Sequence, residues 1–80
     1  MLHIGVFFGG KSGEHEVSLV SGTTVMANLD PARYRVSAIG IRKDGSLAAP
    51  AEARRMLRRP LPHVACPEVI LRPAAAGRFL

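Results

Sequence analysis

The 80-residue sequence has little cysteine and few aromatic residues: one cysteine, no tryptophan and 5% aromatics. The single cysteine, Cys66, excludes an internal disulfide, and no group of cysteine and histidine residues has the spacing of a zinc site. Both absences are typical of a reducing compartment. They predict a cytoplasmic protein in which Cys66 is an inert thiol, because no activating group neighbours it in the sequence.

Long apolar runs are also missing. No stretch approaches the ~20 apolar residues that cross a bilayer, so the sequence excludes a membrane-spanning helix. The first residues lack a basic segment, and Gly9-Gly10-Lys11 interrupts the apolar run that follows. We therefore expect neither a signal peptide nor a membrane partner.

The net charge of +5 lies entirely in the second half of the chain. Residues 1–41 contain three basic and three acidic residues, whereas residues 42–80 contain eight basic and three acidic residues. A basic segment can bind nucleic acid, which leaves a small nucleic-acid-binding protein as one alternative. The arginines have no aromatic residues among them, which argues against single-strand binding. A solvated arginine-rich face is the simpler explanation, and we expect no nucleic acid as partner.

The hydrophobic pattern of the first half predicts an α/β fold. Residues 2–8 form a short apolar run that is typical of a buried parallel strand, and a glycine-rich loop follows at 9–13. A helix is expected over 14–29 with Ser12 as its N-cap, and a second strand over 34–41. Strand, helix and strand together predict one βαβ unit with a parallel strand pair.

The expected helix has a mixed apolar pattern. Small and polar residues in its middle mark either close packing on the sheet or a functional wall. The residues expected to form its apolar face are Val17, Val20, Val25 and Leu29, broadened by Leu19 and Met26.

Less regular structure is expected in the second half. An Asp-Gly pair predicts a hairpin-like turn over 43–46, and a short strand is expected at 47–48. Residues 51–59 are compatible with one or two helical turns. Residues 60–67 contain three prolines and are expected to be extended or irregular, and residues 68–72 are a strand candidate.

The glycine-rich loop follows the carboxyl end of the first strand, where α/β sheets bind ligands. Its Gly-Gly-x-x-Gly order fits neither a phosphate loop nor a dinucleotide fingerprint. Glu14 and Glu16, at the helix start, repel a phosphate and attract an ammonium group through a charge-assisted hydrogen bond. The loop thus indicates a site for a small cationic or zwitterionic ligand such as an amino acid. Alternatively, both glutamates only complement the helix dipole.

The polar neighbours of Glu14 have two interpretations each. Ser18, one helical turn beyond Glu14, either orients its carboxylate or bonds to a backbone carbonyl. His15 is either a proton carrier or a structural hydrogen-bonding partner. Lys11 either reaches an anionic group or points to solvent, and Ser12 has no base partner that would make it a nucleophile.

Residues 6–21 resemble the amino-terminal signature of D-alanine–D-alanine ligases. In that family the first strand ends in Gly-Gly, followed by x-Ser-x-Glu-x-Glu-Val-Ser-Leu and a serine two residues later. Every fixed position of this pattern is matched. The resemblance continues through residues 34–41 and 43–45, and residues 70–73 resemble the longer-insert branch of the family.

The resemblance implies a partial Rossmann-like parallel sheet, which in that family precedes two ATP-grasp domains. The chain is then an incomplete amino-terminal substrate-binding domain, with a βαβ core at 1–45 and an insert or linker at 46–80. The implied reaction uses ATP to phosphorylate one D-alanine, and the amino group of a second attacks the acyl phosphate. The products are D-alanyl-D-alanine for peptidoglycan synthesis, ADP and phosphate. The implied partners are D-alanine and the rest of the ligase chain, in a homodimer.

The resemblance also assigns residues. Glu14 matches the family's glutamate that holds the ammonium group of the first D-alanine and is counted as catalytic. Ser18 matches the serine beside it, Gly9 and Gly10 match the glycines of the substrate-binding loop, and His15 stands at a variable position. The family's His-Gly-x-x-Gly-Glu-Asp-Gly segment, ATP-grasp lysines and magnesium carboxylates are absent from this sequence. ATP and Mg are therefore expected to be bound outside this chain, which alone is expected to be inactive. The alternative is a stand-alone binding module for an amino acid or another small ligand.

Overall fold

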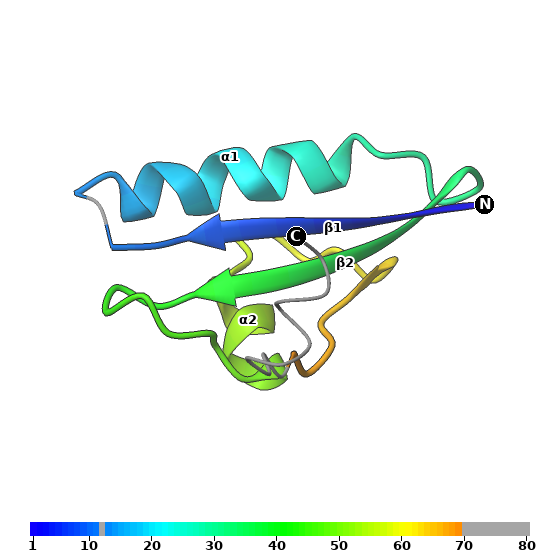
Figure 1. Ribbon diagram of the computed structural model, residues 1–80. Coiled ribbons are helices and arrows are strands. Elements are labelled where there is room, and N and C mark those ends of the chain that lie inside the picture. Colours follow the sequence, from blue (N-terminus) through cyan, green and yellow to red (C-terminus); the bar gives the residue numbers. More distant parts are fainter. Residues whose placement is uncertain (12, 70–80) are drawn as a thin grey trace, which may run out of the picture.

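A computed structural model describes residues 1–11 and 13–69 (Figure 1). The predicted α/β fold with a parallel βαβ unit is confirmed, and the sheet has three parallel strands in the order β1-β2-β3. The elements along the chain are β1 (Leu2–Gly9), α1 (His15–Ala27), β2 (Tyr34–Ile41), α2 (Pro50–Met56) and β3 (Val64–Ala65).

The pairing of β1 with β2 is continuous over both strands. It runs in register from Leu2 opposite Tyr34 to Gly9 opposite Ile41. Figure 1 shows both arrows pointing the same way and α1 running back along β1 from the end where the arrows point. The loop after β1, the start of α1 and the turn after β2 therefore lie at the carboxyl end of the sheet.

One hydrophobic core lies on one face of the sheet. Alternate residues of β1 and β2 point into it, as the pleat of a strand requires. Both helices and the segment around β3 supply the other side. The cluster consists of Phe8, Leu19, Met26, Val36, Ala38, Met56, Leu57, Leu61 and Val64.

The apolar face expected for α1 is wrong for its valines. Val17, Val20 and Val25 are 60%, 54% and 53% exposed. The buried side of α1 carries Leu19 and Met26, as expected, together with His15, Gly22 and Thr23.

A close approach between α1 and β1 explains this orientation. A Cβ atom on Gly22 would lie 2.8 Å from Cβ of Phe8, so only glycine lets the helix come this near the strand. Thr23 is buried beside it with its hydroxyl satisfied, because it donates to the carbonyl of Leu19 at 2.7 Å and accepts from the amide of Arg58 at 3.0 Å. Of the two interpretations of the small residues, close packing on the sheet therefore holds for Gly22 and Thr23.

One expectation for the helices needs correction: the N-cap position of α1 is Glu14 and not Ser12, which lies outside the described residues. The one or two helical turns expected within 51–59 are confirmed by α2, which ends at Met56 because Leu57 is extended (φ −63°, ψ 135°). The third strand lies at 64–65, within the proline-rich segment, since its prolines flank the two residues that pair with β2.

The expectations for residues 43–48 and 68–77 are confirmed in part. The turn over 43–46 is confirmed: Arg42 donates its amide to the carbonyl of Ser46 at 2.7 Å, and Gly45 has a φ of +90°. Leu47 forms a single antiparallel bridge with Ile41. Residues 68 and 69 are not part of a strand, and the rest of that strand candidate, with the turn expected at 73–77, lies outside the described residues.

Two parts of β1 are uncovered among the described residues, its outer edge and the side chain of Phe7. There β1 pairs only with β2, so its outer edge lacks a neighbouring strand. Phe7, on the face opposite the core, is 61% exposed. Neither of the two described helices has the length and hydrophobicity needed to cross a membrane.

We predict that Gly22→Ala destabilises the fold by about 1 kcal/mol. The added methyl group clashes with Phe8, overpacking costs about 1–3 kcal/mol, and the better helix propensity of alanine offsets about 1 kcal/mol of this. Urea unfolding followed by circular dichroism measures the change. Ser21→Ala, on the exposed side of the same turn, is the control and should stay within about 0.5 kcal/mol of the wild type. A Gly22→Ala chain as stable as this control would contradict the packing described.

Candidate functional site

Two loops meet at the carboxyl end of the sheet. The amide of Gly10 donates to the carbonyl of Ile41 at 3.0 Å, which extends the β1–β2 pairing into the loop after β1. Lys11 is exposed, and its Cδ atom lies 2.9 Å from the position of a Cβ on Gly45, in the turn after β2. The loop after β1 thus rests against the strand and the turn that follow it in the sheet.

Gly9 and Gly10 both need the conformational freedom of glycine. Their φ angles are +98° and +110°, which side chains strongly disfavour. A Cβ on Gly9 would also lie 2.3 Å from the carbonyl oxygen of Ile41. Any other residue at position 9 would push the loop away from β2.

Ser18, in α1, forms a side-chain hydrogen bond with this loop. Its hydroxyl oxygen accepts a hydrogen bond from the amide of Gly9 at 2.9 Å. Its own amide donates to the backbone carbonyl of Glu14 at 2.9 Å, as part of the first turn of α1. The sequence suggested a partner in the carboxylate of Glu14 or in a helix carbonyl, whereas this bond connects Ser18 to the loop.

His15 forms a hydrogen bond with the next residue of the same loop, Gly10. Its side chain is buried, with 8% exposed, and Nδ1 lies 2.8 Å from the carbonyl oxygen of Gly10. Of the two interpretations of His15, this geometry favours the structural partner. The sequence left the partner of His15 open, because its contact with the loop exists only in the folded chain.

The two glutamates stand at the start of α1 beside this loop. Both Glu14 and Glu16 are exposed to solvent. Glu14 follows the loop directly and precedes His15, so the hydrogen bonds that fix the loop and the first turn also fix its backbone.

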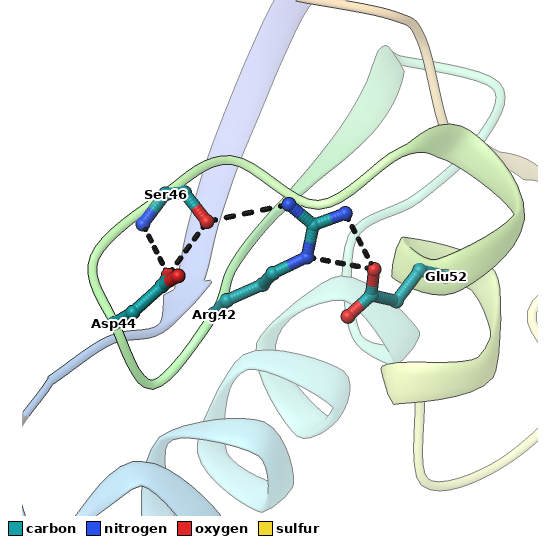
Figure 2. A network of polar contacts seen from close by, with 4 residues as sticks. All are labelled: Arg42, Asp44, Ser46 and Glu52. Carbon is teal, nitrogen blue, oxygen red and sulfur yellow. Dashed lines mark hydrogen bonds and ion pairs between the residues drawn. The ribbon is translucent and has the colours of Figure 1, made fainter.

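A network of charged groups supports the neighbouring turn (Figure 2). Nε and Nη2 of Arg42 each lie 2.8 Å from Oε1 of Glu52 in α2, and Nη1 lies 3.3 Å from the hydroxyl of Ser46. Ser46 in turn donates its amide and its hydroxyl to Oδ1 of Asp44, at 2.9 and 2.6 Å. The sequence did not predict this network, which ties the turn after β2 to the start of α2.

The network shifts the pKa of both of its carboxyl groups. The hydrogen bond from the guanidinium of Arg42 lowers the pKa of Glu52 below its usual value, and the positive charge of Arg42 adds to this. The hydroxyl of Ser46 lowers the pKa of Asp44 in the same way. The hydrogen bond to Glu52 raises the pKa of Arg42.

The depressions among the described residues include two that α2 helps to line. One of about 300 Å³ separates the start of α1 from α2 and is lined by His15, Arg42, Lys43, Glu52 and Met56. The other, of about 420 Å³, is lined by arginines of α2 and the segment after it. Arg54 in that group donates to the carbonyls of Leu61 and Val64, at 3.1 and 2.5 Å, so part of the basic second half anchors the segment that contains β3.

Comparison with known proteins decides the family. A family model described as the D-ala D-ala ligase N-terminus matches residues 3–67. The chain belongs to this family. The matched residues contain the loop, Glu14 and Glu16, and all the described helices and strands apart from Leu2 at the start of β1.

Several ligases resemble this amino-terminal segment. The D-alanine–D-alanine ligase of Corynebacterium efficiens is 38% identical over 98% of this chain and 23% of its own length. That of Rhodococcus erythropolis is 58% identical over 54% of this chain and 12% of its own length. The structure of VanG D-Ala:D-Ser ligase from Enterococcus faecalis is 35% identical, with a TM-score of 0.61 over 70% of this chain and 17% of that one. The chain therefore spans less than a quarter of the length of these ligases.

The described residues of this ligase segment do not form a metal site. Over residues 1–11 and 13–69, no three His, Cys, Asp or Glu side chains are grouped so that they could hold a metal ion.

We predict that the Arg42–Glu52 pair contributes stability that depends on pH. A carboxyl whose pKa is lower in the folded than in the unfolded chain stabilises the fold fully above its unfolded pKa, about 4.3 for glutamate. This contribution is lost as the pH falls through the lower, folded-state pKa. Glu52→Gln should therefore lower the melting temperature at pH 7, and the difference from the wild type should shrink below pH ~4.

Thermal unfolding at pH 7 and pH 3 measures this difference. Glu68→Gln removes the same charge from an exposed position in another part of the chain, and serves as the control. A gap between wild type and Glu52→Gln that is as large at pH 3 as at pH 7 would contradict the assignment.

Proposed function

We propose that this chain is the amino-terminal part of a D-alanine–D-alanine ligase and forms one wall of its first D-alanine site. In the complete enzyme, ATP phosphorylates the carboxylate of the first D-alanine. The amino group of the second D-alanine then attacks the acyl carbon, an amide bond forms, and phosphate leaves. Family membership and the names of the relatives support this reaction.

The position of Glu14 carries the proposal. Its exposed carboxylate stands at the start of α1, directly after the loop at the carboxyl end of β1. Ligands of parallel α/β sheets bind at this end. A carboxylate there accepts charge-assisted hydrogen bonds from the ammonium group of an amino acid, and these are stronger than bonds between neutral groups. Glu14 would thus fix the amino end of D-alanine and leave its carboxylate for phosphorylation.

Gly9, Gly10 and Ser18 complete this wall. Glycines without side chains let a ligand approach the backbone of the loop closely. Ser18 fixes the amide of Gly9 and so keeps the loop in the conformation that the ligand meets.

The other parts of the reaction are assigned to the rest of the ligase chain. ATP and Mg would be bound there, and the 80-residue chain alone would be inactive. Among residues 1–11 and 13–69, the outer edge of β1 is unpaired and the side chain of Phe7 is exposed. Both features support this arrangement, because further strands and helices of a larger domain cover such surfaces. We also propose that the complete ligase is a cytoplasmic homodimer.

Glu14→Gln in the complete ligase should lower kcat/KM for the first D-alanine about 10- to 150-fold. The amide keeps the shape of the carboxylate but loses the charge that binds the ammonium group, and a hydrogen bond to a charged group is worth about 1.5–3 kcal/mol. Steady-state assays of phosphate release at varied D-alanine concentration measure the change.

Glu16→Gln is the matched control, because it removes an exposed glutamate from the same helical turn. If both glutamates only complemented the helix dipole, the two variants would behave alike. Equal kinetics of the two variants, or a wild-type ligase that forms no D-alanyl-D-alanine, would contradict the proposed function.

A further inference from the structure

His15 is the most buried titratable side chain at the candidate site, and the proposed reaction gives it no part. Its imidazole is 8% exposed and lies at the first position of α1. Cε1 of the ring is 3.1 Å from the position of a Cβ on Gly9, so the ring packs directly against the loop. A buried ring in contact with two successive loop residues is well placed to determine the conformation of that loop.

The hydrogen bond between His15 and Gly10 defines the tautomer of the ring. A carbonyl oxygen only accepts, so Nδ1, at 2.8 Å from the oxygen of Gly10, must carry a hydrogen. The bond also satisfies a loop carbonyl, and leaving such a group unpaired in a partly buried position is unfavourable.

Three hydrogen-bonding groups hold Gly9 and Gly10, and the two that come from side chains belong to α1. Ser18 accepts from the amide of Gly9, His15 donates to the carbonyl of Gly10, and Ile41 of β2 accepts from the amide of Gly10. Glycines with positive φ are intrinsically flexible, so a loop that contains two of them keeps one conformation only where neighbouring groups fix it. His15 fixes the end of the glycine pair that leads to Glu14.

We propose that His15 is a positioning residue for the first D-alanine: its Nδ1–H bond to Gly10 fixes the loop and the start of α1, and thereby the carboxylate of Glu14. The inference rests on the proposed function of Glu14. The ring itself does not touch the substrate. It acts through the backbone, because Glu14 is the residue between the loop and the first position of the helix.

Two substitutions at position 15 separate this bond from the bulk of the ring. His15→Leu keeps an apolar side chain of similar size and removes the donor. His15→Asn keeps a donor, because its amide nitrogen is as many bonds from Cβ as Nδ1 is in histidine. In the complete ligase, His15→Leu should raise KM for the first D-alanine about 3- to 10-fold with kcat unchanged within about twofold, and His15→Asn should restore most of the loss.

His63 provides a matched control at the other end of α1. Its Nε2 lies 3.1 Å from the carbonyl oxygen of Met26, so it makes the same kind of bond far from the loop. His63→Leu should lower the melting temperature as His15→Leu does, while KM for D-alanine stays at the wild-type value. If both variants lose stability but only His15→Leu has a raised KM for D-alanine, His15 has a positioning role.

Three outcomes would overturn the inference: an unchanged KM in His15→Leu, an equal rise of KM in His63→Leu, or no rescue by His15→Asn. If His15→Leu does not fold, His15→Gln replaces it, because its amide nitrogen lies one bond further from Cβ, away from Gly10. His15→Asn should then have the lower KM of the two, and equal values would also overturn the inference. Failure of the proposed function is distinguished by Glu14→Gln: a normal KM in that variant rejects the D-alanine site itself.

Discussion

The close contact between the loop after β1 and the strand β2 is the constraint on which the candidate site depends. Gly9 lies so near the carbonyl oxygen of Ile41 that a Cβ at this position would be 2.3 Å away. The contact lets the pairing of the two parallel strands continue to the amide of Gly10, where the loop turns toward α1. The close approach of Gly9 to Ile41 determines the direction in which the chain leaves the sheet. It thereby determines where α1 starts, beside Glu14.

Small residues and backbone hydrogen bonds, more than large apolar side chains, fix α1 on the sheet. Gly22 allows the helix to approach Phe8, and Thr23 is buried with both of its hydrogen bonds made. At the start of the helix, His15 and Ser18 bind the loop backbone. The valines on the outer face contribute little to this packing, since each is more than half exposed. Helix, loop and strand are therefore positioned together, which a site that must place one carboxylate accurately requires.

The sequence predicted the features that depend on local pattern. The apolar run and its glycines located β1 and the loop, β2 has the predicted bounds, and the family signature is confirmed by the match over residues 3–67. The features it missed depend on contacts between distant residues. The approach of Gly22 to Phe8 reverses the face expected from the valines, and Val64 pairs with Val36 although prolines surround it. The bonds of His15 and Arg54 to backbone carbonyls have no sequence pattern. The part of Glu14 in binding is a prediction from the sequence and remains one.

We have proposed that Glu14, positioned by the glycine-rich loop and α1, holds the ammonium group of D-alanine. A crystal structure of the complete ligase with D-alanine bound tests this role. We expect a carboxylate oxygen of Glu14 within about 2.7–2.9 Å of the amino nitrogen, with the loop held by His15 and Ser18. A D-alanine whose amino group is bound by other residues while the Glu14 carboxylate faces solvent would contradict it.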